Sequence, residues 1–169
     1  TDGVTGVGVS GDGTRVAAIG ADKTVRVWNS ADGAAVAAVV IPAPLRQLAT
    51  VAEARQFVTI GDDQVVRVFD FASGREAQHF PAGGAVTGVS FSTPGKAVWT
   101  GPEIGVRAQV AGVKTQWLAD PTKVLVAAWM PDGKQIVTCG EDRVVKIWNR
   151  DGTPVKSLAG YPVPPTAIA

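Results

Sequence analysis

Cysteine, methionine and histidine are nearly absent from this chain of 169 residues, which contains one of each. The single cysteine, Cys139, excludes an internal disulfide framework and a cysteine-rich metal site. Zinc needs three or four ligands, and His79 and Cys139 stand far apart in the chain. We therefore expect no metal and no cofactor.

An excess of charge of either sign is also lacking, because 16 basic and 15 acidic residues leave a net charge of +1. This balance shows no electrostatic footprint for nucleic acid or an anionic membrane. No apolar run approaches the roughly 20 residues of a membrane span, and the first residues lack the charged and apolar regions of a signal peptide. The sequence predicts neither kind of partner and indicates no compartment. An initiating methionine is absent too, as in a piece of a longer chain.

Valine, alanine, glycine (20) and proline (11) are plentiful instead. Valine favours strands, and glycine and proline separate them, so the composition predicts an all-β chain with many short strands.

A repeat of about 40 residues runs through the whole chain. Four similar segments begin at glycines 41, 40 and 39 residues apart: Gly20, Gly61, Gly101 and Gly140. Each segment has an acid in the turn and a cation in the strand that follows. The acids are Asp22, Asp63, Glu103 and Asp142, and the cations are Arg26, Arg67, Arg107 and Lys146. Such a period predicts a solenoid or a propeller.

Each unit contains four expected strands joined by tight turns, as in one blade of a β-propeller. The expected blades cover residues 4–40, 45–80, 86–118 and 124–159, and residues 160–169 form a connection and the start of a further first strand. One segment, 45–57, also has helix-like spacing, but its alignment with the other units favours a strand.

Two segments carry the resemblance to a known family. Residues 25–29 read Val-Arg-Val-Trp-Asn, and residues 145–149 read Val-Lys-Ile-Trp-Asn. Both resemble the WD40 signature, with asparagine in place of the usual aspartate. The resemblance implies an all-β propeller of four WD40-type antiparallel blades, with Trp28, Phe69 and Trp148 as the structural repeat aromatics.

The sequence departs from the WD40 pattern at several positions, and these departures are informative. The family's histidine before the first strand is replaced by Ala82 and Asp120, and its serine or threonine is matched by Thr59 and Thr138 but not by Ala18. In the third unit, Gln109 stands in the tryptophan place and Trp99 in the threonine place. We hypothesise that this unit has exchanged side-chain volume between neighbouring strands.

Four blades would form half of an eight-bladed ring. Exposed strand edges invite pairing with another chain, and a two-fold dimer is the simplest closed solution. We therefore expect a half-ring that dimerises to eight blades. The end of the chain resembles the start of another first strand, so covalent continuation in a longer parent is equally compatible with the sequence.

Few residues are candidates for catalysis or for binding a metal or an anion. The repeated acids suggest a charged ring or a calcium site, but an aspartate that holds its own turn explains the recurrence better. The repeated cations suggest a site for acidic or phosphorylated partners, but polar residues of a strand explain them better. His79 and Cys139 have no visible partner for nucleophilic catalysis. We therefore predict that the protein is not an enzyme.

The resemblance places function on the loops at one edge of the ring. The candidate partner-facing residues are Lys23, Gln64, Ile104, Arg143, Pro81 and Pro121. Our prediction is a non-catalytic protein–protein interaction scaffold that associates with itself and binds other proteins or peptides. The alternatives are a fragment or engineered half-propeller with only an assembly role, and a ligand-binding or enzymatic propeller with a central-channel site.

Overall fold

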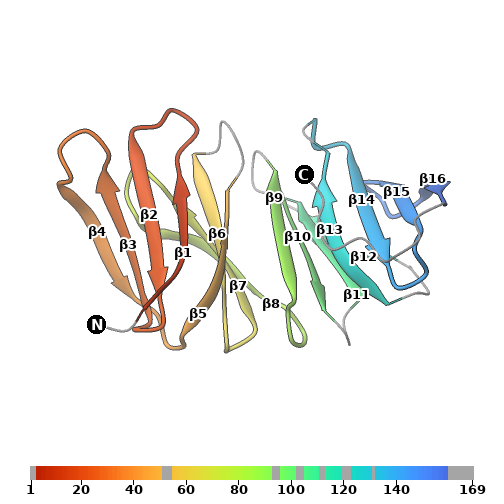
Figure 1. Ribbon diagram of the computed structural model, residues 1–169, viewed down its shortest axis with the longest axis horizontal. Coiled ribbons are helices and arrows are strands. Elements are labelled where there is room, and N and C mark those ends of the chain that lie inside the picture. The colour runs from red at the N-terminus through yellow and green to blue at the C-terminus, as the bar shows by residue number, and fades with distance from the viewer. Residues whose placement is uncertain are drawn as a thin grey trace. The chain divides into compact units, whose positions relative to one another are not determined.

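The computed structural model describes residues 3–50, 55–92, 96–101, 105–110, 113–118, 123–130 and 132–159. Within these ranges the chain forms sixteen strands and no helix, in four antiparallel sheets of four strands each (Figure 1). Every strand pairs with its neighbours in the sequence, so each sheet is one blade. The prediction of an all-β chain built from four-stranded blades is confirmed.

The first two blades contain eight strands: β1 (Val4–Val9), β2 (Arg15–Gly20), β3 (Thr24–Asn29), β4 (Ala35–Val40), β5 (Leu45–Ala49), β6 (Gln56–Gly61), β7 (Val65–Asp70) and β8 (Glu76–Pro81). The other two contain β9 (Gly88–Ser92), β10 (Lys96–Gly101), β11 (Gly105–Val110), β12 (Val113–Leu118), β13 (Val124–Trp129), β14 (Gln135–Gly140), β15 (Val145–Asn149) and β16 (Pro154–Leu158). The strand interpretation of the ambiguous segment is correct for 45–49 and 56–57, whereas residues 51–54 lie outside the described ranges.

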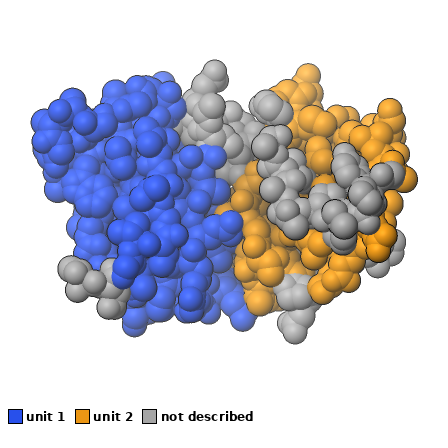
Figure 2. Space-filling view, in the orientation of Figure 1, with its two compact units in different colours: residues 1–81 blue, residues 82–169 orange. Residues whose placement is uncertain are grey.

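The chain divides into two compact units, residues 1–81 and residues 82–169, which Figure 2 colours separately. The first unit contains blades 1 and 2, and the second contains blades 3 and 4. Each unit is described by itself below.

Cross-strand pairing gives each blade two different faces, because residues directly opposite each other share a face. We call the face with the apolar residues of the third strand the valine face: Val25 and Val27 in blade 1, Val66 and Val68 in blade 2, Val145 and Ile147 in blade 4. The opposite face carries the repeated cation and the repeat aromatic, and we call it the aromatic face. Trp28, Phe69 and Trp148 occupy the same register position on it.

In the first unit, the valine face of blade 1 packs on the aromatic face of blade 2. The shared core joins buried residues of both blades: Ala17, Ile19, Val25, Val27, Ile41, Leu45, Phe57, Phe69 and Phe71. Phe57 stacks on Phe69 with ring centroids 5.3 Å apart, and Phe71 lies 4.7 Å from Phe57. The first strands approach closely at Gly8, where an added Cβ would lie 2.6 Å from Leu48 Cδ2. Glycine is needed there because the neighbouring blade leaves no room for a side chain.

The second unit repeats this packing. Val98, on the valine face of blade 3, shares a core with residues of blade 4: Val124, Ala127, Trp129, Ile136 and Trp148. Four of these five lie on the aromatic face of blade 4, namely Ala127, Trp129, Ile136 and Trp148. In both units, therefore, the valine face of one blade packs on the aromatic face of the next blade.

The register of the strand ladders shifts at similar places in the blades. The ladder between first and second strands shifts at Val4/Gly6, Leu45/Gln47 and Val124/Val126. The ladder between third and fourth strands shifts at Val27/Trp28, Val68/Phe69, Ala108/Val110 and Ile147/Trp148. A bulge bends the strand and increases its twist, so these positions help shape each blade.

Candidate functional site

The predicted turn acids lie between the second and third strands of their blades. Each described one accepts a hydrogen bond from the backbone N–H two residues later: Asp22 from Thr24 (3.2 Å), Asp63 from Val65 (3.3 Å) and Asp142 from Val144 (3.2 Å). An aspartate in this role mimics a backbone turn and favours the hairpin. Glu103 lies outside the described residues.

The same acids also pair with the repeated cations. Arg26 Nη2 lies 2.8 Å from Asp22 Oδ2, Arg67 Nη1 lies 3.1 Å from Asp63 Oδ1, and Lys146 Nζ lies 2.8 Å from Asp142 Oδ2. Hydrogen bonds from Arg26 and then Thr24 lower the pKa of Asp22 to about 2. Arg67 likewise lowers the pKa of Asp63. Acid and cation thus recur together as one ion pair per described hairpin, which offsets the positive charge that a phosphorylated partner would need.

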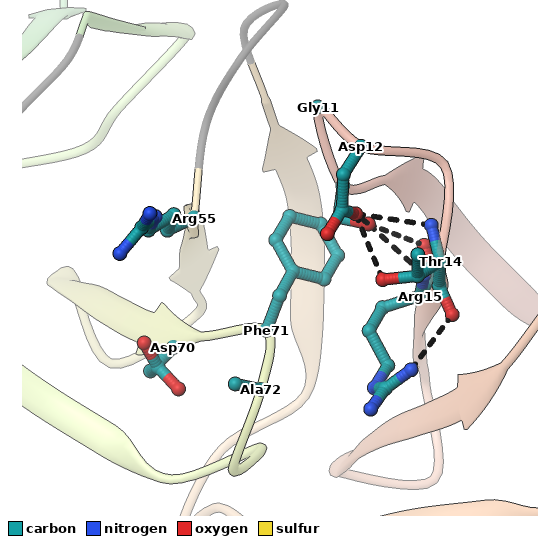
Figure 3. A pocket seen from close by; sticks show the side chains of 9 residues that line it. Gly11, Asp12, Thr14, Arg15, Arg55, Asp70, Phe71 and Ala72 are labelled. Atoms are coloured by element: carbon teal, nitrogen blue, oxygen red, sulfur yellow. Dashed lines mark hydrogen bonds between the residues drawn. The ribbon is translucent and has the colours of Figure 1, made fainter.

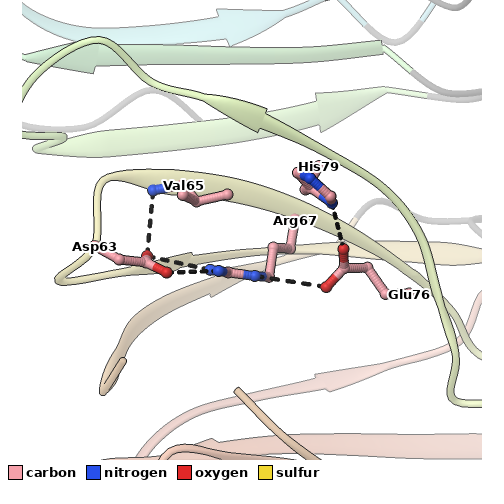
Figure 4. A network of polar contacts seen from close by, with 5 residues as sticks. All are labelled: Asp63, Val65, Arg67, Glu76 and His79. Atoms are coloured by element: carbon pink, nitrogen blue, oxygen red, sulfur yellow. Dashed lines mark hydrogen bonds and ion pairs between the residues drawn. The ribbon is translucent and has the colours of Figure 1, made fainter. Parts of the chain in front are cut away.

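In blade 2 the ion pair is part of a larger network of polar contacts (Figure 4). The buried Arg67 guanidinium contacts Asp63 on one side, and its Nε lies 3.5 Å from Glu76 Oε2 on the other. The other Glu76 oxygen lies 2.6 Å from Nδ1 of the exposed His79. A buried charge is tolerated only when it is paired. The polar contacts of Arg67 therefore compensate for its burial, and His79 lies at the end of this network of polar contacts.

The candidate partner-facing residues lie beside these acids. Lys23, Gln64 and Arg143 are exposed, and each adopts a left-handed conformation with φ of 65°, 58° and 61°. In the described chain they are the only residues other than glycine with positive φ. This conformation is uncommon for such side chains. Pro81 is also exposed at the end of β8. Ile104 and Pro121 lie outside the described residues.

The connection between blades 1 and 2 joins their turns into one edge of the first unit. Ile41 donates its N–H to Lys23 O (2.7 Å), and Pro44 O accepts from Asp62 N (3.0 Å). Arg46 forms a two-fold bridge to Asp62 at 2.6 and 2.8 Å, and it lowers the pKa of Asp62. We call this edge, formed by residues 21–23, 41–46 and 62–64, the loop edge. Its bridge is exposed and adds little stability.

The repeat aromatics differ in what their rings can bond. In blade 4, Trp148 Nε1 donates to the buried Thr138 Oγ1 at 2.8 Å. In blade 2, Phe69 takes the place of this tryptophan and has no N–H. Thr59 stands where Thr138 stands, and its buried Oγ1 has no hydrogen-bond partner among the described residues.

The sequence matches a protein-family model over two stretches. The WD domain, G-beta repeat family matches residues 1–29 and 115–149. These matches end at Asn29 and Asn149, the residues after Trp28 and Trp148. These two stretches match WD40 repeats. Repeats of this family generally mediate protein–protein interactions, and WD40 propellers are typically non-enzymatic scaffolds. No curated protein matches the chain.

The third blade, most of which lies outside the matched stretches, departs most from the WD40 pattern. Trp99 pairs with Arg107 and therefore occupies the register of Thr59 and Thr138. Its ring is fully buried, and Nε1 donates to Ala82 O at 3.3 Å. Gln109 pairs with Ala97, in the register of Phe69 and Trp148. This register is consistent with the exchange of volume that the sequence suggests.

The other residues considered for catalysis or metal binding form no catalytic arrangement within the described ranges. Burial, and secondarily Asp142, raise the pKa of the Cys139 thiol, which disfavours the reactive thiolate. The described residues contain no group of three or more His, Cys, Asp or Glu side chains able to hold a metal ion. They also contain no helix long and apolar enough to cross a membrane.

Proposed function

We propose that this chain is a non-catalytic WD40 scaffold that pairs with a second copy of itself and presents its loop edge and the corresponding hairpin of blade 4 to protein partners. The observation that supports self-association is a difference in burial between equivalent faces. On the aromatic face of blade 2, Phe57 and Phe69 are fully buried. On the same face of blade 1, Val7 is 68% exposed, Val9 is 51% exposed and Trp28 is only half-buried.

The last blade, blade 4, offers a valine face that is complementary to the exposed aromatic face of blade 1. On the valine face of blade 1, Ala17 and Val27 are buried, because blade 2 covers them. Their equivalents on blade 4, Val137 and Ile147, are half-buried, and Leu158 is 39% exposed. Blade 1 therefore exposes its aromatic face and blade 4 exposes its valine face, and faces of these two kinds pack together inside each unit.

A second copy is the partner that fits both faces. The aromatic face of blade 1 in one copy would pack on the valine face of blade 4 in the other, and the reverse contact follows from a two-fold axis. Burial of apolar surface drives such an association. Two copies would then supply eight blades.

Partners other than a second copy would bind at the loop edge of the first unit and at the corresponding hairpin of blade 4. Lys23, Gln64 and Arg143 project from hairpins whose acids are already bonded, so their exposed side chains are available for contact. Pro81 belongs to the same candidate set, with Ile104 and Pro121 as the corresponding expectations in the third blade and the following connection. A protein or peptide fits these exposed, mixed-charge turns.

Light scattering on a sizing column tests self-association. A species of twice the 17.4 kDa chain is expected over a wide range of concentrations. Val7→Lys would place a charge in the proposed contact and should shift the protein to monomer, whereas Ala31→Lys adds the same charge to an exposed turn and should not. A well-folded monomer at every concentration would contradict the proposal and leave the two faces to a different occupant.

A further inference from the structure

A cavity of about 600 Å³ lies in the first unit, at the ends of the strands opposite the loop edge (Figure 3). The turn between β1 and β2 forms one wall with Asp12 and Arg15. Arg55, just before β6, and the Asp70–Phe71 segment that ends β7 line it from blade 2. Since Phe71 also belongs to the core that joins the two blades, the cavity exists only where they pack together.

Each of the two carboxylates of this cavity is bonded to its own turn through its Oδ1 atom. Asp12 Oδ1 accepts hydrogen bonds from Ser10 Oγ (2.6 Å), Thr14 Oγ1 (2.8 Å) and Thr14 N (3.0 Å). These bonds, that of Ser10 first, lower the pKa of Asp12 to about 2. Asp70 Oδ1 accepts from Ser73 N (2.9 Å) and Ser73 Oγ (3.0 Å).

The two guanidinium groups, in contrast, keep unused donors. Arg15 Nη1 donates to Thr14 O (3.0 Å), but its buried Nε has no hydrogen-bond partner among the described residues. The Arg55 side chain makes no hydrogen bond or ion pair within the described ranges either. An unpartnered buried N–H is costly. The cavity therefore offers unused guanidinium donors beside carboxylates that are each bonded within their own turn through Oδ1.

We infer that this cavity binds a carboxylate side chain from an acidic segment of a protein partner. Arginine is suited to the ligand because its planar guanidinium presents paired N–H groups that match a carboxylate. The cavity is larger than a single carboxylate group, and its volume lies in the range of typical ligand-binding pockets. The apolar atoms of Phe71 and Ala72 would contact the stem of a glutamate. The inference rests on the proposed scaffold role but not on self-association.

The test uses an acetylated hexaglutamate peptide and the full chain labelled with ¹⁵N. Titration should shift the backbone resonances of residues 10–15, 55 and 70–72 and leave those of the loop edge unchanged. Arg15→Gln and Arg55→Gln should each weaken binding by about tenfold, the loss expected for one charge-assisted hydrogen bond. Arg75→Gln is the matched control, because Arg75 is an exposed arginine of the same unit outside the cavity lining. It should change the affinity by less than about twofold.

Several results would overturn the inference. Equal losses for all three variants would mean that the peptide responds to net charge alone. Equal binding of hexaglutamine would remove the role of the carboxylate, and displacement of the peptide by inorganic phosphate at equal concentration would assign the site to small anions. Light scattering separates this inference from the proposed function: a dimer that ignores the peptide contradicts the cavity site alone, and a monomer that binds it contradicts self-association alone.

Discussion

Blades 2 and 4 carry different aromatic residues at the same position of the repeat, Phe69 and Trp148, and these residues make different contacts. Blade 4 has the Trp148–Thr138 hydrogen bond, whereas in blade 2 Phe69 stacks on Phe57 and Thr59 Oγ1 has no hydrogen-bond partner among the described residues. Both blades nevertheless have the same four antiparallel strands. The fold therefore depends on apolar periodicity and burial, and the hydrogen bond is a local addition that blade 2 lacks.

Blade 3 provides the most severe test of this comparison, because it places its largest ring on another strand. Trp99→Thr should reduce the free energy of unfolding by about 3–5 kcal/mol, the cost of a large cavity in a core. Chemical denaturation measures this loss. The double variant Trp99→Thr with Gln109→Trp should recover part of it if volume has been exchanged. A change within about 0.5 kcal/mol for the single variant, the range of surface substitutions, would reject the exchange.

Two glycines in the turns after the third strands allow the cost of blade packing to be measured apart from the cost of backbone strain. Gly74 and Gly33 have similar positive φ values of 65° and 71°, but a Cβ at Gly74 would overlap Ala37 Cβ, whereas at Gly33 it meets nothing within 4 Å. Gly33→Ala should therefore cost only the left-handed strain, about 1–2 kcal/mol. Gly74→Ala should cost about 1–3 kcal/mol more, the usual penalty for overpacking. Thermal or chemical unfolding of the two variants gives the difference, and equal losses would contradict the close approach of the blades.

The two threonines should respond in opposite directions to the same substitution. Thr138→Val leaves the buried indole N–H of Trp148 without this acceptor and should cost about 1–3 kcal/mol. Thr59→Val removes a buried hydroxyl that has no partner among the described residues and should be neutral or stabilising by up to about 1 kcal/mol. Denaturant midpoints of both variants provide the measurement. Equal destabilisation would show that the blades do not differ as described.

The smallest expected effect concerns the hairpin ion pairs and pH. The pKa of Asp22 falls from an ordinary 3.8 to about 2 on folding, so its contribution to stability is complete above 3.8 and is lost as pH falls toward 2. Asp22→Asn should make the unfolding free energy less sensitive to pH in this window. Denaturation of both proteins at several pH values checks the slope. An unchanged slope would mean that Asp22 is not held in its charged form by Arg26 and Thr24.

Much of the blade architecture could be predicted from the sequence, because a 40-residue period and alternating valines are local signals. The register of Trp99 and the places of the turn acids followed from that period. The left-handed backbone at Lys23, Gln64 and Arg143 was missed, since none is a residue type that favours it. The cavity beside Arg15 and Arg55 could not be predicted either, because it arises from the packing of two blades.

The most direct test of the central claim, that a second copy completes the blade packing, is a cross-link between the two exposed faces. Leu48 of blade 2 meets Gly8 of blade 1, and the equivalent positions on the exposed faces are Val7 and Ala128. The native Cys139 is buried and contributes little background. Under mild oxidation, a mixture of Val7→Cys and Ala128→Cys proteins should give a disulfide-linked pair of chains, and neither variant alone should. Equal cross-linking in the mixture and in the single variants, or none in the mixture, would contradict the account.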